Sequence, residues 1–108
     1  MIPVRYHAAA EDGLLNEIGY LELRVPGLGR RFYAEVRRAE SLIAQFPESA
    51  QELAPGIRKH TLRKFRFSLI YSIEEDGLLI LAVAHHGRRP DYWLPRVSQS
   101  KGRARPGE

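Results

Sequence analysis

The stretch FRFSLIYSIEEDGLLILAVA (residues 65–84) decides the fold of this 108-residue chain. An apolar side chain occupies every second position from residue 65 to 73, a period typical of a strand with one covered face. Asp76-Gly77 then predicts a tight turn, because glycine accepts the positive φ that such a turn demands. Residues 78–84 are almost wholly apolar, which predicts a central strand. The stretch therefore predicts a β-hairpin whose apolar face needs a cover.

Two helical patterns that precede this hairpin supply the cover. Between residues 8 and 25 apolar side chains recur at spacings of four, three and four, and between residues 32 and 46 at four, three, four and three. The Pro/Gly break at residues 26–29 is short, so we expect an antiparallel helical hairpin. Gly13 and Gly19 either weaken the first helix or mark the close approach of a neighbour.

The remaining segments complete an α+β fold. Residues 2–6 alternate weakly and predict a short N-terminal strand, residues 48–56 read as a loop, and residues 57–63 return to a period of two. The expected order is β-α-α-β-β-β, with the helical hairpin packed on a largely antiparallel sheet of three to four strands. We assign residues 1–97 to a single domain and residues 98–108 to a flexible basic tail.

Composition and charge limit the function classes. The chain has no cysteine, no apolar leader and no run long enough to span a membrane, so we expect a cytoplasmic protein without disulfides. Net charge is +4, but residues 1–56 carry 6 Lys/Arg against 8 Asp/Glu, whereas residues 57–108 carry 11 against 5. The basic second half favours a polyanion or an acidic protein partner, although plain solubility also explains such a charge.

Side chains able to bind phosphate or to perform chemistry gather where the last predicted strand ends. They are His85, His86, Arg88, Arg89, Tyr92 and Trp93, with Lys59, Arg63 and Arg66 on strands alongside. Arginine matches phosphate oxygens and aromatic rings stack on bases. For RNA cleavage, Lys59 or His85 is a candidate base, Arg63, Arg88 and Arg89 are candidate donors to the phosphoryl oxygens, and Tyr92 or His86 is a candidate acid.

A structural explanation of the same residues stays open. One histidine can close the strand with a hydrogen bond, the arginines can be solvated, and Tyr92 and Trp93 can pack over the helix pair. For Trp93 we favour this core role. The two histidines are neighbours on a strand and point to opposite sides, so we expect no metal site and no cofactor.

The order of elements and three segments carry a resemblance to a known family. The segments are PGLGRRF (residues 26–32), IRK (57–59) and LAVAH (81–85) followed by Tyr92-Trp93. Together they make residues 2–96 similar to the RelE/ParE superfamily of bacterial toxins, and most similar to its ParE-type, plasmid-stabilisation branch. The resemblance implies a toxin of a type II toxin–antitoxin module, which arrests growth unless a cognate antitoxin holds it.

The resemblance also implies where partners bind. Antitoxins of this superfamily wrap a helix-containing segment around the toxin, so the outer hairpin residues Leu15, Tyr20, Leu23 and Tyr33 are candidate antitoxin contacts, unless they belong to the core. ParE-type members poison DNA gyrase without a catalytic constellation. By that analogy the target-binding candidates are Lys59, Arg66, Arg88, Arg89, Tyr92 and Trp93.

RelE-type members of the superfamily are ribosome-dependent messenger-RNA endonucleases, which keeps cleavage open as the alternative. Under that alternative the catalytic candidates are Lys59, Arg63, His85, Arg88, Arg89 and Tyr92. The chain lacks the sheet-borne glutamate base of YoeB-like ribonucleases, and its long helical hairpin is closer to the ParE type. We therefore expect a gyrase inhibitor without enzymatic activity, with the ribonuclease as runner-up and a toxin that has lost its toxicity as a third possibility.

Overall fold

A computed structural model describes residues 2–97 of the chain. In chain order its elements are β1 (Val4–Tyr6), α1 (Ala8–Arg24), α2 (Leu28–Gln45), β2 (Gln51–Ala54), β3 (Ile57–Thr61), β4 (Phe67–Glu74) and β5 (Gly77–His85). The predicted α+β class, with its N-terminal strand, helical hairpin and mostly antiparallel sheet, is confirmed. The predicted tail, residues 98–108, lies outside the described residues. No helix within residues 2–97 is both long and apolar enough to cross a membrane.

The sheet is built around the hairpin predicted from residues 65–84. Its strand order is β1-β5-β4-β3-β2, with β1 parallel to β5 and every other pair antiparallel. Glu74 pairs with Gly77, so the connecting turn is Glu75-Asp76, one residue earlier than expected. Gly77 has a φ of 139°, and a Cβ there would collide with the carbonyl oxygen of Pro3. Glycine is required here both by the turn and by the approach of the chain before β1.

One carboxylate stabilises the turn between the two helices. Glu22, near the end of α1, accepts hydrogen bonds from the backbone N–H groups of Gly27 (2.7 Å) and Gly29 (3.0 Å) at the start of α2. These donors have no partner inside the helix, so the carboxylate caps it. A Cβ on Gly29 would collide with the carbonyl oxygen of Ile18, whereas Gly13 and Gly19 have open space around them. Close approach of the helices is therefore at Gly29.

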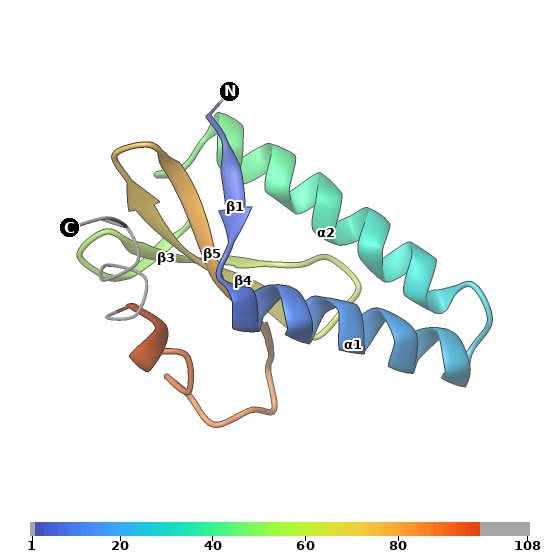
Figure 1. The fold of residues 1–108 in the computed structure, drawn as a ribbon. Helices are drawn as coiled ribbons and strands as arrows, with labels where there is room; N and C mark the ends of the chain where they lie inside the picture. The colour runs from blue at the N-terminus through green and yellow to red at the C-terminus, as the bar shows by residue number, and fades with distance from the viewer. Residues whose placement is uncertain (1, 98–108) are drawn as a thin grey trace.

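Two apolar clusters lie on opposite faces of the sheet. Helix residues such as Leu14, Phe32 and Val36 pack with Leu69 and Ile80 of the central strands, which confirms that the helices cover this face. On the other face the cluster comprises Ile57, Ile70, Leu79, Leu81, Ala82 and Trp93. Figure 1 shows the helix pair on one side of the sheet and the segment after β5, in orange and red, on the other. The sheet is thus covered on both faces, by helices and by a loop.

Residues 48–56, which we expected to be a loop, contain the edge strand β2. It has four mostly exposed residues, too few to reveal a period of two in the sequence. Its pairing with β3 is helped by Arg58, whose guanidinium donates to the backbone carbonyls of Glu48 (2.9 Å) and Ala50 (2.7 Å). Contacts from one arginine to backbone carbonyls outside its own strand help to hold this segment, and such contacts leave no periodic pattern in the sequence.

Candidate functional site

The predicted group forms a cluster around the end of β5, with side chains on both faces of the sheet. We call Lys59, His85, His86, Arg88, Arg89 and Tyr92 the strand-end cluster. All six line one open pocket of about 320 Å³, together with Trp93 and Ser68. The antiparallel pairing of β3, β4 and β5 brings Lys59 alongside the strand end, as a meander must. The residues predicted from the sequence therefore line one pocket, except for Arg63 and Arg66.

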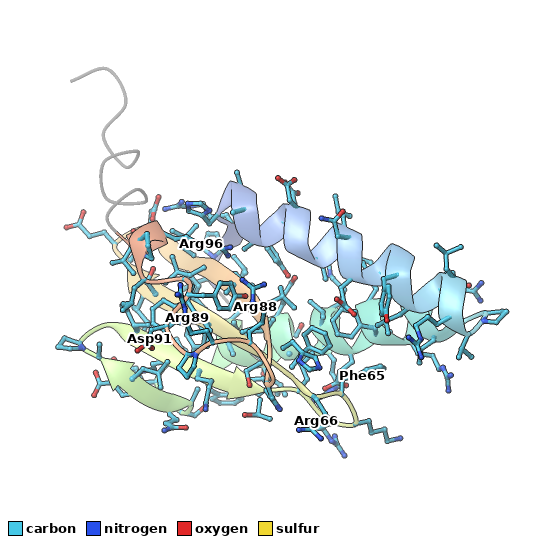
Figure 2. The ribbon with its side chains drawn as sticks, turned by 90° about the horizontal axis from the view of Figure 1, so that it is seen from below. Phe65, Arg66, Arg88, Arg89, Asp91 and Arg96 are labelled. Atoms are coloured by element: carbon cyan, nitrogen blue, oxygen red, sulfur yellow. The ribbon has the colours of Figure 1, made fainter. Side chains whose placement is uncertain are left out.

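Arg63 and Arg66 do not line this pocket. They belong to the loop between β3 and β4, which we call the basic loop (Arg63-Lys64-Phe65-Arg66). The loop is nevertheless attached to the cluster, because the backbone N–H of His86 donates to the carbonyl of Arg66 at 2.9 Å. Figure 2 shows Phe65 and Arg66 on this loop, with Arg88 and Arg89 on the segment that follows β5.

Tyr92 is the centre of the strand-end cluster because two arginines hold its ring. The guanidinium carbon of Arg88 lies 3.8 Å from the ring centroid and that of Arg96 lies 5.2 Å from it. Arg96 is itself fixed by a 2.7 Å hydrogen bond from its Nη1 to the carbonyl of Leu81 on β5. Sequence reasoning missed Arg96. The available signal was a cation four residues after an aromatic side chain, a spacing that also occurs in Tyr20/Arg24 and Tyr33/Arg37 on the helical hairpin.

The two histidines point to opposite faces of the sheet, as expected. The His85 ring packs edge-on against Phe67 at 5.0 Å, and its Nδ1 accepts a 2.9 Å hydrogen bond from the backbone N–H of Gly87. On the other face, His86 Nε2 lies 2.9 Å from the hydroxyl oxygen of Ser68. Each imidazole thus shapes the loop after β5. Within residues 2–97 no group of three or more His, Asp or Glu side chains is placed to hold a metal ion.

Trp93 is buried, with 5% of its surface exposed, which confirms the core role we favoured. The expected location is wrong, however, because its ring packs against Ile70 and Leu81 on the sheet face opposite the helix pair. The error has a physical cause. Apolar residues on both faces of β4 and β5 make either face a possible seat for an aromatic ring, and the sequence does not say which way the chain turns after His85.

A second candidate surface is the outer side of the helical hairpin. We call Leu15, Tyr20, Leu23 and Tyr33 the hairpin face; their exposed fractions are 60%, 52%, 90% and 40%, so the alternative that they belong to the core is excluded. Large apolar side chains exposed together on rigid helices are typical of a protein-binding site. Arg24 and Arg37 lie over the rings of Tyr20 and Tyr33, at 5.4 and 5.9 Å, and give the face a cationic rim.

The hairpin face continues into a groove of about 430 Å³ between the helices and β1. Leu15, Ile18, Tyr33 and Arg37 are among the side chains that line it, together with Tyr6 and Glu40. The hydroxyl of Tyr6 donates to the Glu40 carboxylate, and burial together with this carboxylate raises the pKa of Tyr6 above its usual range. The groove therefore has apolar walls around a fixed polar pair.

Comparisons with known proteins match this chain to a family model and to a solved structure. A family model described as the ParE toxin of the type II toxin–antitoxin system parDE matches residues 4–90. No curated protein matches the chain. Among solved structures, the chromosomal ParDE toxin–antitoxin system from P. aeruginosa is similar, with a TM-score of 0.67 and 15% sequence identity, covering 79% of this chain and 96% of the other. At that identity the structural similarity concerns the fold.

Proposed function

The chain belongs to the family of ParE toxins of type II toxin–antitoxin systems, and from this membership we propose that it arrests growth by binding and inhibiting DNA gyrase while a cognate antitoxin neutralises it. The fold and the family support the toxin role. The strand-end cluster is the surface we assign to gyrase, and the hairpin face is the surface we assign to the antitoxin.

The assignment of the antitoxin rests on the chemistry of the hairpin face. Two of its large side chains, Leu15 and Tyr33, line the groove between the helices and β1, while Tyr20 and Leu23 are exposed further along α1, on elements that packing holds rigid. An amphipathic helix from a partner fits such a surface because its apolar stripe displaces water from these side chains. Glu40 is already paired with Tyr6 and Arg37, so a basic side chain of the partner would pair with Glu11, which also lines the groove.

One observation favours inhibition by binding over catalysis at the strand-end cluster. Both imidazoles are engaged in hydrogen bonds that shape the loop, His85 with Gly87 and His86 with Ser68. A general base needs its lone pair directed at the substrate. Arg88 and Arg89 are exposed instead, which suits them to contact an acidic or phosphate-bearing surface.

The RelE-like ribonuclease stays the second candidate for a specific reason. Lys59, Arg88, Arg89 and Tyr92 line the same pocket, so one candidate base that remains open (Lys59), two cations and an acid lie around one volume. No hydrogen bond of the Tyr92 hydroxyl to another described residue occupies it, so this group is available to a substrate. A ribonuclease would cut transcripts, whereas a gyrase inhibitor would change DNA topology.

The deciding experiment expresses the chain from a tightly repressed promoter in bacteria that lack the antitoxin. Messenger-RNA integrity and plasmid supercoiling are followed over the minutes after induction. The double variant Arg88→Gln with Arg89→Gln is followed in parallel and tests the strand-end cluster. We expect intact transcripts together with relaxed or broken DNA, and a clearly smaller effect in the variant. Rapid transcript cleavage with unchanged topology would overturn the proposal in favour of the ribonuclease. Normal growth would mean that toxicity has been lost.

A further inference from the structure

A second cationic surface lies away from the strand-end pocket, between α2 and the basic loop. Here a hollow of about 460 Å³ is lined by four cations, Arg31, Arg38, Arg63 and Lys64, and by a single carboxylate, that of Glu35. Arg31 comes from the first turns of α2, and Arg63 and Lys64 come from the loop across from it. Two elements far apart in sequence thus place like charges around one hollow.

The carboxylate that lines the hollow, that of Glu35, already has hydrogen-bond partners within the protein. Glu35 accepts two hydrogen bonds from the Arg38 guanidinium, at 3.0 and 2.6 Å, and a third at 2.9 Å from the backbone N–H of Arg63. Its pair with Arg38 is neutral as a unit. Within residues 2–97 no ion pair engages Arg31, Arg63 or Lys64. Arg63 lies close enough to Glu35 to help lower the pKa of that carboxyl, but the hollow still has four cations against this one carboxylate, and a bound polyanion would relieve the repulsion among them.

Contacts with the rest of the fold hold the backbone of the basic loop in one conformation. The N–H of Leu62 donates to the carbonyl of Phe67 at 2.9 Å, which closes the loop at its base. The ring of Phe65 packs edge-on against Phe32 at 5.2 Å, and Lys64 has a φ of 68°. A lysine rarely adopts this left-handed conformation, so the surrounding contacts hold it there. The loop is therefore ordered before any partner arrives.

The ligand that this surface fits is a phosphodiester backbone. Arginine and lysine bind phosphate oxygens, and none of the residues in the 2–97 range that line the hollow offers a free carboxylate or amide side chain that would read base edges. The one aromatic residue, Phe65, is packed on Phe32 and is not available for stacking on unpaired bases. These features favour a duplex over a single strand. The carbonyl of Arg66 also joins the loop to His86, so the surface continues towards the strand-end cluster.

We propose that the basic loop and the facing turn of α2 bind the backbone of double-stranded DNA, without sequence preference, beside the surface that contacts gyrase. The choice of DNA over RNA rests on the proposed function, because gyrase acts on DNA. A toxin that touches both the enzyme and the duplex it holds gains affinity from two contacts that act together.

The test measures binding of the purified chain to a fluorescent DNA duplex of about two helical turns, roughly 20 base pairs, by anisotropy at several salt concentrations. The loop variant is Arg63→Gln with Lys64→Gln. The control is Arg24→Gln with Arg37→Gln, which lowers net charge equally on the hairpin. We expect the loop variant to bind about tenfold or more weakly, and its slope of log affinity against log salt to fall by about 2. The control should change neither quantity appreciably.

Three results would overturn this proposal: equal losses in both variants, which would indicate only the general field of a basic protein; unchanged binding by the loop variant; or tighter binding of a single strand or an RNA duplex. A loop variant that keeps DNA affinity but loses the antitoxin would assign the loop to the antitoxin. The anisotropy assay contains no gyrase, so its failure is distinguishable from a failure to inhibit gyrase, which a separate supercoiling assay reports.

Discussion

The hairpin face and the strand-end cluster are both exposed, yet their chemistry is opposite. The hairpin face presents leucine and tyrosine from two helices that packing fixes. The strand-end cluster presents lysine and histidine from β3 and β5, and histidine and arginine from the segment after β5, which is held by hydrogen bonds and by the Tyr92 ring. Binding at the first surface should depend mainly on buried apolar area, so its affinity should change less with salt. Binding at the second should weaken as salt rises.

On the proposed function, this difference assigns neutralisation and toxicity to separate surfaces. An antitoxin helix on the hairpin face would not need to touch Arg88 or Arg89, so each surface can be altered without damaging the other. The strand-end cluster, however, depends on a buried anchor, because Trp93 fixes the segment that carries it. Substitutions can distinguish the anchor, Trp93, from residues that contact a partner, and can distinguish the hairpin face from the strand-end cluster.

The largest effect is expected at Trp93. Replacing it with alanine removes a buried aromatic ring and should lower the free energy of unfolding by about 3–5 kcal/mol, measured by urea denaturation. Trp93→Phe keeps most of the ring and should cost clearly less. Since alanine threatens folding, the phenylalanine variant carries the functional test, and it should still inhibit gyrase. A well-folded Trp93→Phe protein with no inhibition would make Trp93 a direct contact and contradict its role as anchor.

The next largest effect is expected on antitoxin affinity, when a negative charge is placed on the hairpin face at Leu23. Leu23 is 90% exposed, so Leu23→Glu should change stability by no more than about 0.5 kcal/mol. If an antitoxin helix buries it, the lost apolar contact should weaken antitoxin binding by about 2–3 kcal/mol, roughly 30- to 150-fold. Titration calorimetry measures this affinity. Leu94→Glu is the matched control, because Leu94 is exposed on the segment after β5. Equal losses in both variants would remove the hairpin face as the antitoxin site.

A smaller effect separates the ring of Tyr92 from its hydroxyl. Tyr92→Phe keeps the ring between Arg88 and Arg96, and the supercoiling assay should show inhibition within about twofold of the unaltered chain. Tyr92→Ala removes both cation–π contacts, each of about 0.5–1 kcal/mol at an exposed site, and should raise the inhibitory concentration roughly tenfold. A general acid would behave differently: Tyr92→Phe would then cost about two to four orders of magnitude in RNA cleavage.

The same comparison shows what the sequence could predict. The period of two in residues 65–73 and the helical spacing before it depend on many side chains facing one core, so the fold class followed from them. The residues of the strand-end cluster are close in sequence and lie on paired strands, so their meeting was also predictable. Local patterns failed where one distant contact decides: Arg58 on the Glu48 and Ala50 carbonyls, and Arg96 on the Leu81 carbonyl.

The exposure of the hairpin face shows another limit. Leu14 and Leu15 are neighbours of the same chemical type, yet the first is buried and the second is 60% exposed. Helical spacing identifies the stripe that contains Leu14, but it cannot say whether a further apolar side chain widens that stripe or faces a partner. Only the packing of α1 against β5 and α2 separates the two cases.

The smallest predicted effect concerns Glu35, which links the helical hairpin to the basic loop. The Arg38 guanidinium, followed by the N–H of Arg63, holds the pKa of this carboxyl below its usual value. The ionised form is therefore favoured by the fold, and the stability it contributes is present above the pKa of the unfolded chain, about 4.3. That stability is lost as pH falls through the lower pKa of the folded state.

Glu35→Gln should therefore lower the free energy of unfolding at pH 7 by no more than about 1 kcal/mol, because the ion pair is close to solvent. The difference from the unaltered chain should shrink as pH drops from about 5 to 3, as urea midpoints will show. Glu75→Gln is the control, since this residue is exposed in the β4–β5 turn and should have no effect beyond about 0.5 kcal/mol at either pH. A Glu35→Gln deficit that grows on acidification would mean that the fold raises the pKa of this carboxyl instead of lowering it. Arg38 would then lose its ionised partner as pH falls, and the hollow between α2 and the basic loop would carry one more unpaired cation under acidic conditions.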